Sequence, residues 1–237
     1  MSEDLEGVYS AVATPFTQDQ HLDEAGLRRL VDRTIESGIH GLVPLGSTGE
    51  FFALSRGERE CALEVVLEQT AGRVPVVPHT GATSTAEAIA LSQHAEKAGA
   101  TALMLVAPYY EPFSIEEVKS YYKDVAGSVS IPVMAYNLPA ATGVNLTPQI
   151  LCELIDEVPN VRYVKDTSGD FTAAAQLIHE FGDRVSVFVG WDTLFGYTAA
   201  VKAGMELVGH PAGPQRAPGA ALTGPRLREL EKALAAL

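Results

Sequence analysis

Lys165 is the residue whose position most suggests chemistry. It stands in Val-Arg-Tyr-Val-Lys-Asp-Thr-Ser-Gly at residues 161–169, where an apolar run typical of a short buried strand comes to its end. A lysine amine attacks carbonyl carbons only when it is unprotonated, and desolvation or a nearby cation lowers its pKa toward neutrality. The alternative interpretation is a structural lysine that extends to solvent or pairs with the neighbouring Asp166.

Two further features could serve the same chemistry. Tyr136 ends a predicted strand one repeat before Lys165 ends the next, so the phenol and the amine are expected on neighbouring strands, close enough to exchange a proton. The Gly-Ser-Thr-Gly stretch at residues 46–49 offers backbone N–H groups and two hydroxyls, which suit a carboxylate or phosphate, although it is also ordinary turn chemistry. An amine, a phenol and an anion-binding loop together indicate carbonyl chemistry.

Other candidate residues carry weaker signals. His79 could act as an acid or base, but a hydrogen-bonded structural imidazole is favoured. Tyr109 and Tyr110 follow a predicted strand, and either could line the mouth of a site or pack at a subunit contact. The histidines form no ligand pattern with carboxylates, so no metal is expected. The commonest hydrolase and nucleotide-binding motifs, Gly-x-Ser-x-Gly and Gly-x-x-x-x-Gly-Lys-[Ser/Thr], are missing from the sequence.

Composition limits the partners. The 237 residues include 17 Lys and Arg against 30 Asp and Glu, a net charge of −13 that disfavours nucleic acid and anionic membrane surfaces. No apolar run approaches the length of a membrane span, and the first residues lack the basic and apolar regions of a signal peptide. Two cysteines far apart in sequence indicate neither a metal site nor a disulfide framework. A cytoplasmic protein is therefore expected.

The elements that would position these side chains alternate along the chain. Strands are predicted at 8–12, 41–45, 74–79, 102–106, 131–136, 161–165 and 185–189, each followed by an amphipathic helix. Helix starts are marked by Ser55 with Glu58, Ser84 with Glu87, Ser114 with Glu117, Thr147 before Pro148, and Asp170. Repeated βα units predict parallel strands with right-handed crossovers.

A closed TIM (β/α)8 barrel is the favoured architecture. The length matches one barrel domain over residues 1–237, and a dinucleotide-binding open sheet loses support because Gly-x-Gly-x-x-Gly is absent after the first strand. In such a barrel the active site lies at the carboxyl ends of the strands. That ring includes Lys165, Tyr136, the 46–50 stretch, Tyr110, and Gly190 with Asp192 after the seventh strand.

The motifs at these strand ends resemble a known family, the pyruvate-dependent class I aldolases that include dihydrodipicolinate synthase, N-acetylneuraminate lyase and 2-keto-3-deoxygluconate aldolase. The matching motifs are Gly-Ser-Thr-Gly-Glu at 46–50, Pro-Tyr-Tyr at 108–110, Tyr-Asn-Leu-Pro-Ala-Ala-Thr-Gly at 136–143 and Val-Lys-Asp-Thr-Ser-Gly at 164–169. The likeness runs from about residue 7 to residue 196. It favours a functional Lys165 over a structural one.

The resemblance implies a role for each motif residue. Lys165 would form a Schiff base with pyruvate or a 2-keto acid, and Tyr136 would shuttle protons. Ser47 and Thr48 would bind the pyruvate carboxylate, with Thr48 also in the proton relay, and Tyr110 would reach toward that relay, in some members from a neighbouring subunit. The resemblance further implies a homo-oligomer, in particular a tetramer, and an enzyme that needs no cofactor or metal.

Substrate choice rests on two further positions. By this resemblance, dihydrodipicolinate synthases typically carry an arginine at the motif position where this chain has Ala141. The missing carboxylate clamp counts against aspartate semialdehyde as the acceptor. The sequence is more similar to the sugar-acid lyases and aldolases. Gly190 and Asp192 are the remaining substrate-binding candidates; Asp192 could bind the hydroxyls of a polyol or simply cap a helix that runs to about residue 203.

The C-terminal part has two interpretations. In the first, Gly204 ends the seventh helix, residues 205–210 form a substitute eighth strand and residues 225–236 the last helix. In the second, favoured one, residues 200–218 resemble the family's far C-terminal helix and its Pro/Arg-rich tail, with roughly 50 to 60 residues missing after Gly196. Such a barrel would be incomplete at strand eight and the C-terminal helical extension, and a non-catalytic barrel is then an alternative to the enzyme.

Overall fold

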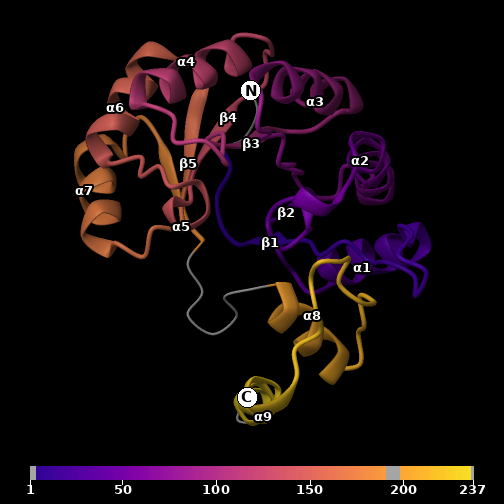
Figure 1. Cartoon of the computed structure of the whole chain (residues 1–237). Helices are drawn as coiled ribbons and strands as arrows, with labels where there is room; N and C mark the ends of the chain where they lie inside the picture. The colour runs from indigo at the N-terminus through magenta and orange to yellow at the C-terminus, as the bar shows by residue number, and fades with distance from the viewer. Residues whose placement is uncertain (1–3, 191–197, 236–237) are drawn as a thin grey trace. The chain divides into compact units, whose positions relative to one another are not determined.

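The computed structural model describes residues 4–190 and 198–235 (Figure 1). Contacts within the chain separate it into two compact units, of which unit 1 comprises Met1–Gly7 and Pro75–Trp191, and unit 2 comprises Val8–Val74 and Asp192–Leu237. Both units contain parallel strands that alternate with helices, so the predicted α/β class is confirmed. No helix in the described ranges is long and apolar enough to cross a membrane.

Unit 1 is built on a parallel sheet with the strand order β3-β4-β5-β6. The strands are β3 (Leu103–Val106), β4 (Val133–Asn137), β5 (Val161–Asp166) and β6 (Ser186–Val189). The helices are α3 (Thr85–Ala98), α4 (Ile115–Ala126), the short α5 (Pro139–Thr142), α6 (Pro148–Glu157) and α7 (Phe171–Phe181). Four predicted strands and their connecting helices are therefore present in the predicted order.

The two faces of this sheet differ in what covers them. Leu105, Ala135, Val164 and Val187 align across the four strands, and they pack with side chains of α3, α4, α6 and α7 in the hydrophobic core. The next residue of each strand points to the opposite face, because side chains alternate along a strand. That second row comprises Val106, Tyr136, Lys165 and Phe188. The core therefore lies on one face and the candidate site on the other.

The predicted strand at residues 74–79 is only partly formed. Met104 of β3 donates to the carbonyl oxygen of Pro78 and accepts from the backbone N–H of Thr80, and His79 and Met104 form an isolated bridge. Pro75 and Pro78 carry no N–H group to extend the ladder. The segment lies along β3 without becoming a regular strand, and the prolines explain why.

Unit 2 contains the first two strands and the C-terminal helices. Its elements are β1 (Tyr9–Ala11), α1 (Glu24–Glu36), β2 (Gly41–Val43), the 3-10 helix η1 (Phe51–Ala53), α2 (Arg56–Thr70), α8 (Thr198–Leu207) and α9 (Gly224–Leu234). Strands β1 and β2 pair in parallel, with Tyr9 opposite Gly41. A Cβ at position 41 would lie 2.1 Å from the Tyr9 ring, so glycine at this position leaves room for that ring.

The predicted substitute strand at residues 205–210 is wrong. Residues 205–207 belong to α8, Gly204 lies inside that helix rather than after it, and Val208 still donates to the Gly204 carbonyl. Glu206 and Leu207 are exposed and pair with no strand among the described residues, so the backbone hydrogen bonds of this stretch are made within the helix. The second interpretation, a helix followed by a proline-rich tail, agrees with α8 and with the irregular chain that follows it up to α9.

Candidate active site

Lys165 is the penultimate residue of β5 and stands directly opposite Tyr136 of β4. Its side chain is half-buried, and the amine Nζ lies 4.2 Å from the centroid of the Tyr136 ring. The predicted placement of the two residues on neighbouring strands is therefore confirmed. The contact is made to the face of the ring, where an ammonium group is attracted by the π electrons. For a proton to pass to the phenol oxygen, the flexible lysine chain must swing toward the edge of the ring.

Asp166 is not the partner of Lys165, although the two are adjacent in sequence. Its side chain points to the other face of the sheet, where its Oδ1 accepts a hydrogen bond of 2.8 Å from Asn137 Nδ2. Its Oδ2 accepts one of 2.8 Å from the Ser168 hydroxyl. Lys165 forms no ion pair among the residues that the structure describes. The alternative interpretation, in which Lys165 pairs with Asp166, therefore does not hold.

Gly190 leaves the space that the Lys165 side chain occupies. A Cβ at this position would lie 2.5 Å from Lys165 Cε and 2.5 Å from Thr167 Oγ1. The position is fixed by a hydrogen bond of 2.8 Å from the Gly190 N–H to the Asp166 carbonyl. The structure thus places Gly190, a predicted substrate-binding residue, directly beside the side chain of Lys165.

Thr167 is a further candidate for the site, to which the sequence analysis gave no role. Its Oγ1 is buried next to the same side chain and has no hydrogen-bond partner within the described part of the chain. A hydroxyl in this state is available to a bound polar group. The signal was present in the sequence, because Thr167 belongs to the same Lys-Asp-Thr motif as Lys165.

Tyr110 does not approach the amine within its own unit. Its side chain is 92% exposed, and its φ of +94° is rare for a residue with a side chain. Asp192, another of the predicted substrate-binding residues, lies outside the described residues. No group of three His, Cys, Asp or Glu side chains in the described ranges is arranged to hold a metal ion.

Ser47 and Thr48 belong to unit 2, in a tight loop that follows β2. Both are half-buried, and the loop is flanked by Leu45 and Glu50, which have left-handed φ values of +62° and +55°. The Thr14 hydroxyl holds the loop by donating a hydrogen bond of 2.6 Å to the Gly49 carbonyl. The left-handed backbone at both ends makes the loop turn tightly. Tight turns of this kind can point successive backbone N–H groups toward an anion.

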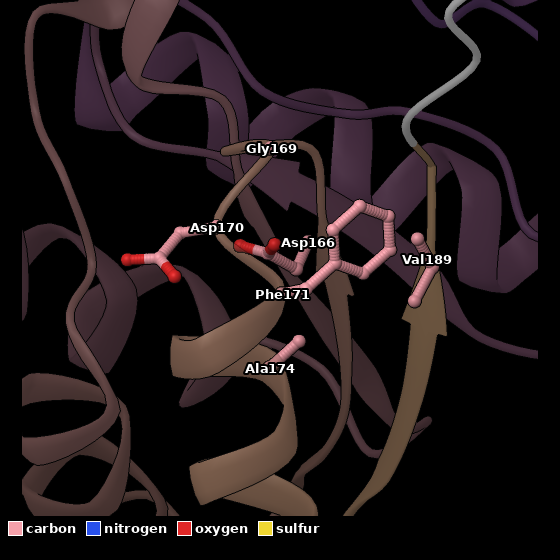
Figure 2. Close-up of a pocket in the computed structure, with 6 residues that line it drawn as sticks. All are labelled: Asp166, Gly169, Asp170, Phe171, Ala174 and Val189. Carbon is pink, nitrogen blue, oxygen red and sulfur yellow. The ribbon is translucent and has the colours of Figure 1, made fainter.

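A hollow in unit 1 lies at the start of α7 (Figure 2). It is lined by Asp166, Gly169, Asp170, Phe171, Ala174 and Val189. Asp166 and Val189 stand opposite each other in the register, one residue beyond Lys165 and Phe188. Because successive side chains point to opposite faces, this hollow does not contain the amine.

Comparison with known proteins identifies related sequences. The model of the dihydrodipicolinate synthetase family matches residues 4–206. N-acetylneuraminate lyase of Shigella boydii serotype 4 is 42% identical over 196 residues, covering 82% of this chain and 65% of that protein. The 4-hydroxy-tetrahydrodipicolinate synthase of Methanopyrus kandleri is 38% identical over 195 residues, with the same coverage of 82% and 65%. This chain thus spans slightly less than two thirds of the length of these curated relatives.

Solved structures agree with the fold. YagE of Escherichia coli K12, a prophage protein of the dihydrodipicolinic acid synthase family solved in complex with pyruvate, matches with a TM-score of 0.90 and 29% identity, covering 97% of both chains. A putative dihydrodipicolinate synthetase from Pseudomonas aeruginosa matches with a TM-score of 0.91 and 27% identity, covering 98% of this chain and 99% of that one. Structures of this family are TIM barrels, so the predicted fold class is confirmed.

Proposed function

We propose that this chain, which belongs to the dihydrodipicolinate synthetase family, is a class I lyase or aldolase that makes or cleaves a 2-keto acid through a Schiff base on Lys165. The observation that carries the proposal is the position of the Lys165 amine, 4.2 Å from the Tyr136 ring centroid on the paired strand and without a carboxylate partner among the described residues. The substrates of the reaction are pyruvate and an aldehyde. The names of the relatives, a lyase and a synthase, support this class of reaction.

The steps follow from the chemistry of an amine and a carbonyl. Lys165 Nζ adds to the keto carbon, and loss of water gives a protonated imine. The imine accepts the electron pair of the C3–C4 bond while the C4 hydroxyl loses its proton and the aldehyde leaves. Protonation of C3 and addition of water then release pyruvate and the free amine. Tyr136 moves the protons of the carbinolamine and of the C4 hydroxyl, and no cofactor or metal takes part.

The remaining roles belong to the same proposal. Ser47 and Thr48 bind the carboxylate of pyruvate, and Thr48 also takes part in the proton relay. Gly190 gives the substrate and the lysine room, and Asp192 binds hydroxyl groups of the aldehyde part. Tyr110 joins the relay of a neighbouring copy in a homo-oligomer, in particular a tetramer, and its exposed side chain supports this role. The enzyme acts in the cytoplasm.

A sugar-acid substrate is favoured over aspartate semialdehyde. Ala141 is an exposed residue of the short helix α5, which follows β4, and its methyl group cannot hold the carboxylate of an aldehyde substrate. The N-acetylneuraminate lyase relative supports the same side of the family. Lysine biosynthesis, through condensation with aspartate semialdehyde, is the rival reaction.

The decisive experiment traps the imine. The protein is incubated with pyruvate and borohydride, and its peptides are analysed by mass spectrometry. A reduced pyruvate adduct is expected on Lys165, and none is expected in Lys165→Met. Lys119→Met serves as the control, because Lys119 is a lysine of α4 that is ion-paired with residues of α6. Absence of an adduct from Lys165 would reject the enzyme and leave the non-catalytic barrel.

A substrate panel then separates the two reactions. Release of pyruvate from N-acetylneuraminate or a 2-keto-3-deoxy sugar acid is expected. Condensation of pyruvate with aspartate semialdehyde, without any activity on the sugar acids, would instead place the chain in lysine biosynthesis.

A further inference from the structure

Glu50 is the last residue of the loop proposed to bind the carboxylate of pyruvate. A buried acidic residue is unusual next to an anion-binding loop. Its side chain is 2% exposed, and its backbone is left-handed. A buried carboxylate is costly unless it is paired and hydrogen-bonded. A negative charge beside a loop proposed to bind an anion would also repel that anion if it were not neutralised.

The partners of Glu50 come from the far end of the chain. The amine of Lys202 on α8, a side chain that is 5% exposed, lies 2.6 Å from Glu50 Oε1. The same amine donates to the carbonyl oxygens of Thr14 at 2.8 Å and Pro214 at 2.9 Å. Burial lowers the pKa of the Lys202 amine, and the ion pair with Glu50 opposes that effect. The second carboxylate oxygen, Oε2, accepts a hydrogen bond of 2.9 Å from the backbone N–H of Arg216.

The same C-terminal segment also holds the start of the loop. Thr198, the first residue of α8, donates a hydrogen bond of 3.0 Å from its hydroxyl to the Ser47 carbonyl. The guanidinium of Arg216 donates to the Ala53 carbonyl at 2.9 Å, just after the loop, and forms an ion pair with Glu58 at 2.7 Å. Residues from one segment therefore contact the loop at Ser47 and at Glu50, and the chain that follows it at Ala53.

This network fits a positioning role better than a purely stabilising one. A buried ion pair is often no more stabilising than a well-packed apolar pair of the same size. Directed bonds here come from the Lys202 amine, which donates to two backbone carbonyls, and from the Arg216 N–H, which donates to Glu50. The loop needs such restraint, because Leu45 and Glu50 both hold left-handed backbone that persists only when the surroundings determine it. A loop that drifted would misplace the groups that bind the anion.

We propose that Glu50, Lys202, Arg216 and Thr198 form an ionic anchor that holds the loop at residues 46–50 in its carboxylate-binding shape, so that these four are positioning residues for pyruvate. This rests on the proposed function, because pyruvate is the ligand that reports on the loop. The residues of the anchor do not touch substrate; they act through the loop.

Two variants test the anchor. Thr198→Val keeps the size and shape of the side chain and removes only the bond to Ser47. The pair Glu50→Gln with Lys202→Met removes both charges together and leaves no buried charge behind. In each, the pyruvate concentration that gives half-maximal borohydride trapping on Lys165 is expected to rise about tenfold, while trapping at saturating pyruvate changes less than about twofold.

Lys119→Met is the matched control. Lys119 is also a nearly buried, ion-paired lysine, 9% exposed, but it belongs to unit 1 and contacts Glu153 and Glu157. Its loss is expected to lower the free energy of unfolding without changing the half-saturating pyruvate concentration. An equal half-saturating concentration in the anchor variants and the unaltered protein would overturn the anchor.

Amide hydrogen exchange gives a readout that does not depend on pyruvate. Exchange across residues 46–53 is expected to be faster in both anchor variants than in the unaltered protein or in Lys119→Met. If the unaltered protein forms no adduct, the proposed function fails, and exchange alone then decides on the anchor. Unchanged exchange in this stretch would reject it.

Discussion

At the scale of single residues, the contact between Lys165 and Tyr136 makes the phenol the group to test. Tyr136→Phe keeps the ring, so the cation–π contact and the packing remain, but it removes the oxygen that carries protons. Formation of the pyruvate adduct is expected to slow by about 10²- to 10⁴-fold, the usual contribution of a proton-transfer group. Single-turnover trapping with borohydride measures this rate. A rate within threefold of the unaltered protein would remove Tyr136 from the mechanism.

Gly190 offers a second test at this scale. In Gly190→Ala the new methyl group would lie 2.5 Å from Lys165 Cε, and the lysine, being flexible, is expected to give way rather than the sheet. Adduct formation should slow by about tenfold or more because the amine is misplaced, with little change in thermal stability.

Gly57→Ala provides the control for that substitution. Gly57 lies in the first turn of α2, and a Cβ there would meet nothing within 4 Å. The change is expected to leave adduct formation unaltered and to stabilise the helix slightly. Equal behaviour of the two variants would mean that the space beside Lys165 is not needed.

At the scale of elements, Asn137 joins the ends of β4 and β5 on the face opposite Lys165. Its Nδ2 donates to Asp166 at 2.8 Å and to Asn145 at 3.1 Å, and its Oδ1 accepts from the Leu146 N–H at 2.9 Å. The carbonyl of Asn137 also accepts from the Thr167 N–H at 2.9 Å. These bonds fix the end of the strand from which the amine projects.

Loss of this amide should be costly. Asn137→Ala would leave the buried Asp166 carboxylate with fewer donors, and the free energy of unfolding is expected to fall by about 3 kcal/mol. Urea denaturation measures the change. Asn160→Ala is the comparison, since Asn160 donates one bond of 2.8 Å, to the Ala126 carbonyl, and its loss should cost about 1 kcal/mol. Equal losses of unfolding free energy in the two variants would show that the side-chain hydrogen bonds of Asn137 together add no more than one ordinary hydrogen bond.

At the scale of the whole molecule, acid should unfold the chain partly through Glu58. Its hydrogen bond with Arg216, opposed by burial, lowers the pKa of Glu58 from 4.5 to about 2. Well above pH 4.5 the carboxylate is ionised in both the folded and unfolded states, and its contribution to stability is complete. Between pH 4.5 and 2 the unfolded chain gains a proton that the folded chain resists, so stability falls.

Glu58→Gln tests this dependence on pH. Glutamine preserves the capping box with Ser55 but cannot titrate, so the free energy of unfolding should decline less steeply between pH 4.5 and 2 than in the unaltered protein. Denaturation at a series of pH values measures the slope. Glu68→Gln, at an exposed side chain, serves as the control. A slope as steep in Glu58→Gln as in the unaltered protein would contradict the assignment.

The sequence by itself determined the features that depend on near neighbours. Ser55 with Glu58, Ser114 with Glu117, and Asp170 start helices as predicted, because a cap uses groups within three residues of itself. The order of parallel strands also followed from the sequence, and with it the pairing of Lys165 with Tyr136. At residues 74–79 the apolar pattern favoured a strand while the prolines opposed it, and the predicted strand is only partly formed.

Only the tertiary structure decided what each charged side chain contacts. Asp166 is adjacent to Lys165 in sequence, yet the alternation of a strand turns it toward Asn137, and the amine lies over the Tyr136 ring instead. Likewise, α8 extends through residues 205–207, and its Lys202 lies against Glu50, a contact that forms only when the helix packs. Glu50 and Lys202 are separated by about 150 positions, and no local pattern of residues encodes a contact between groups so far apart, because it exists only once the elements pack.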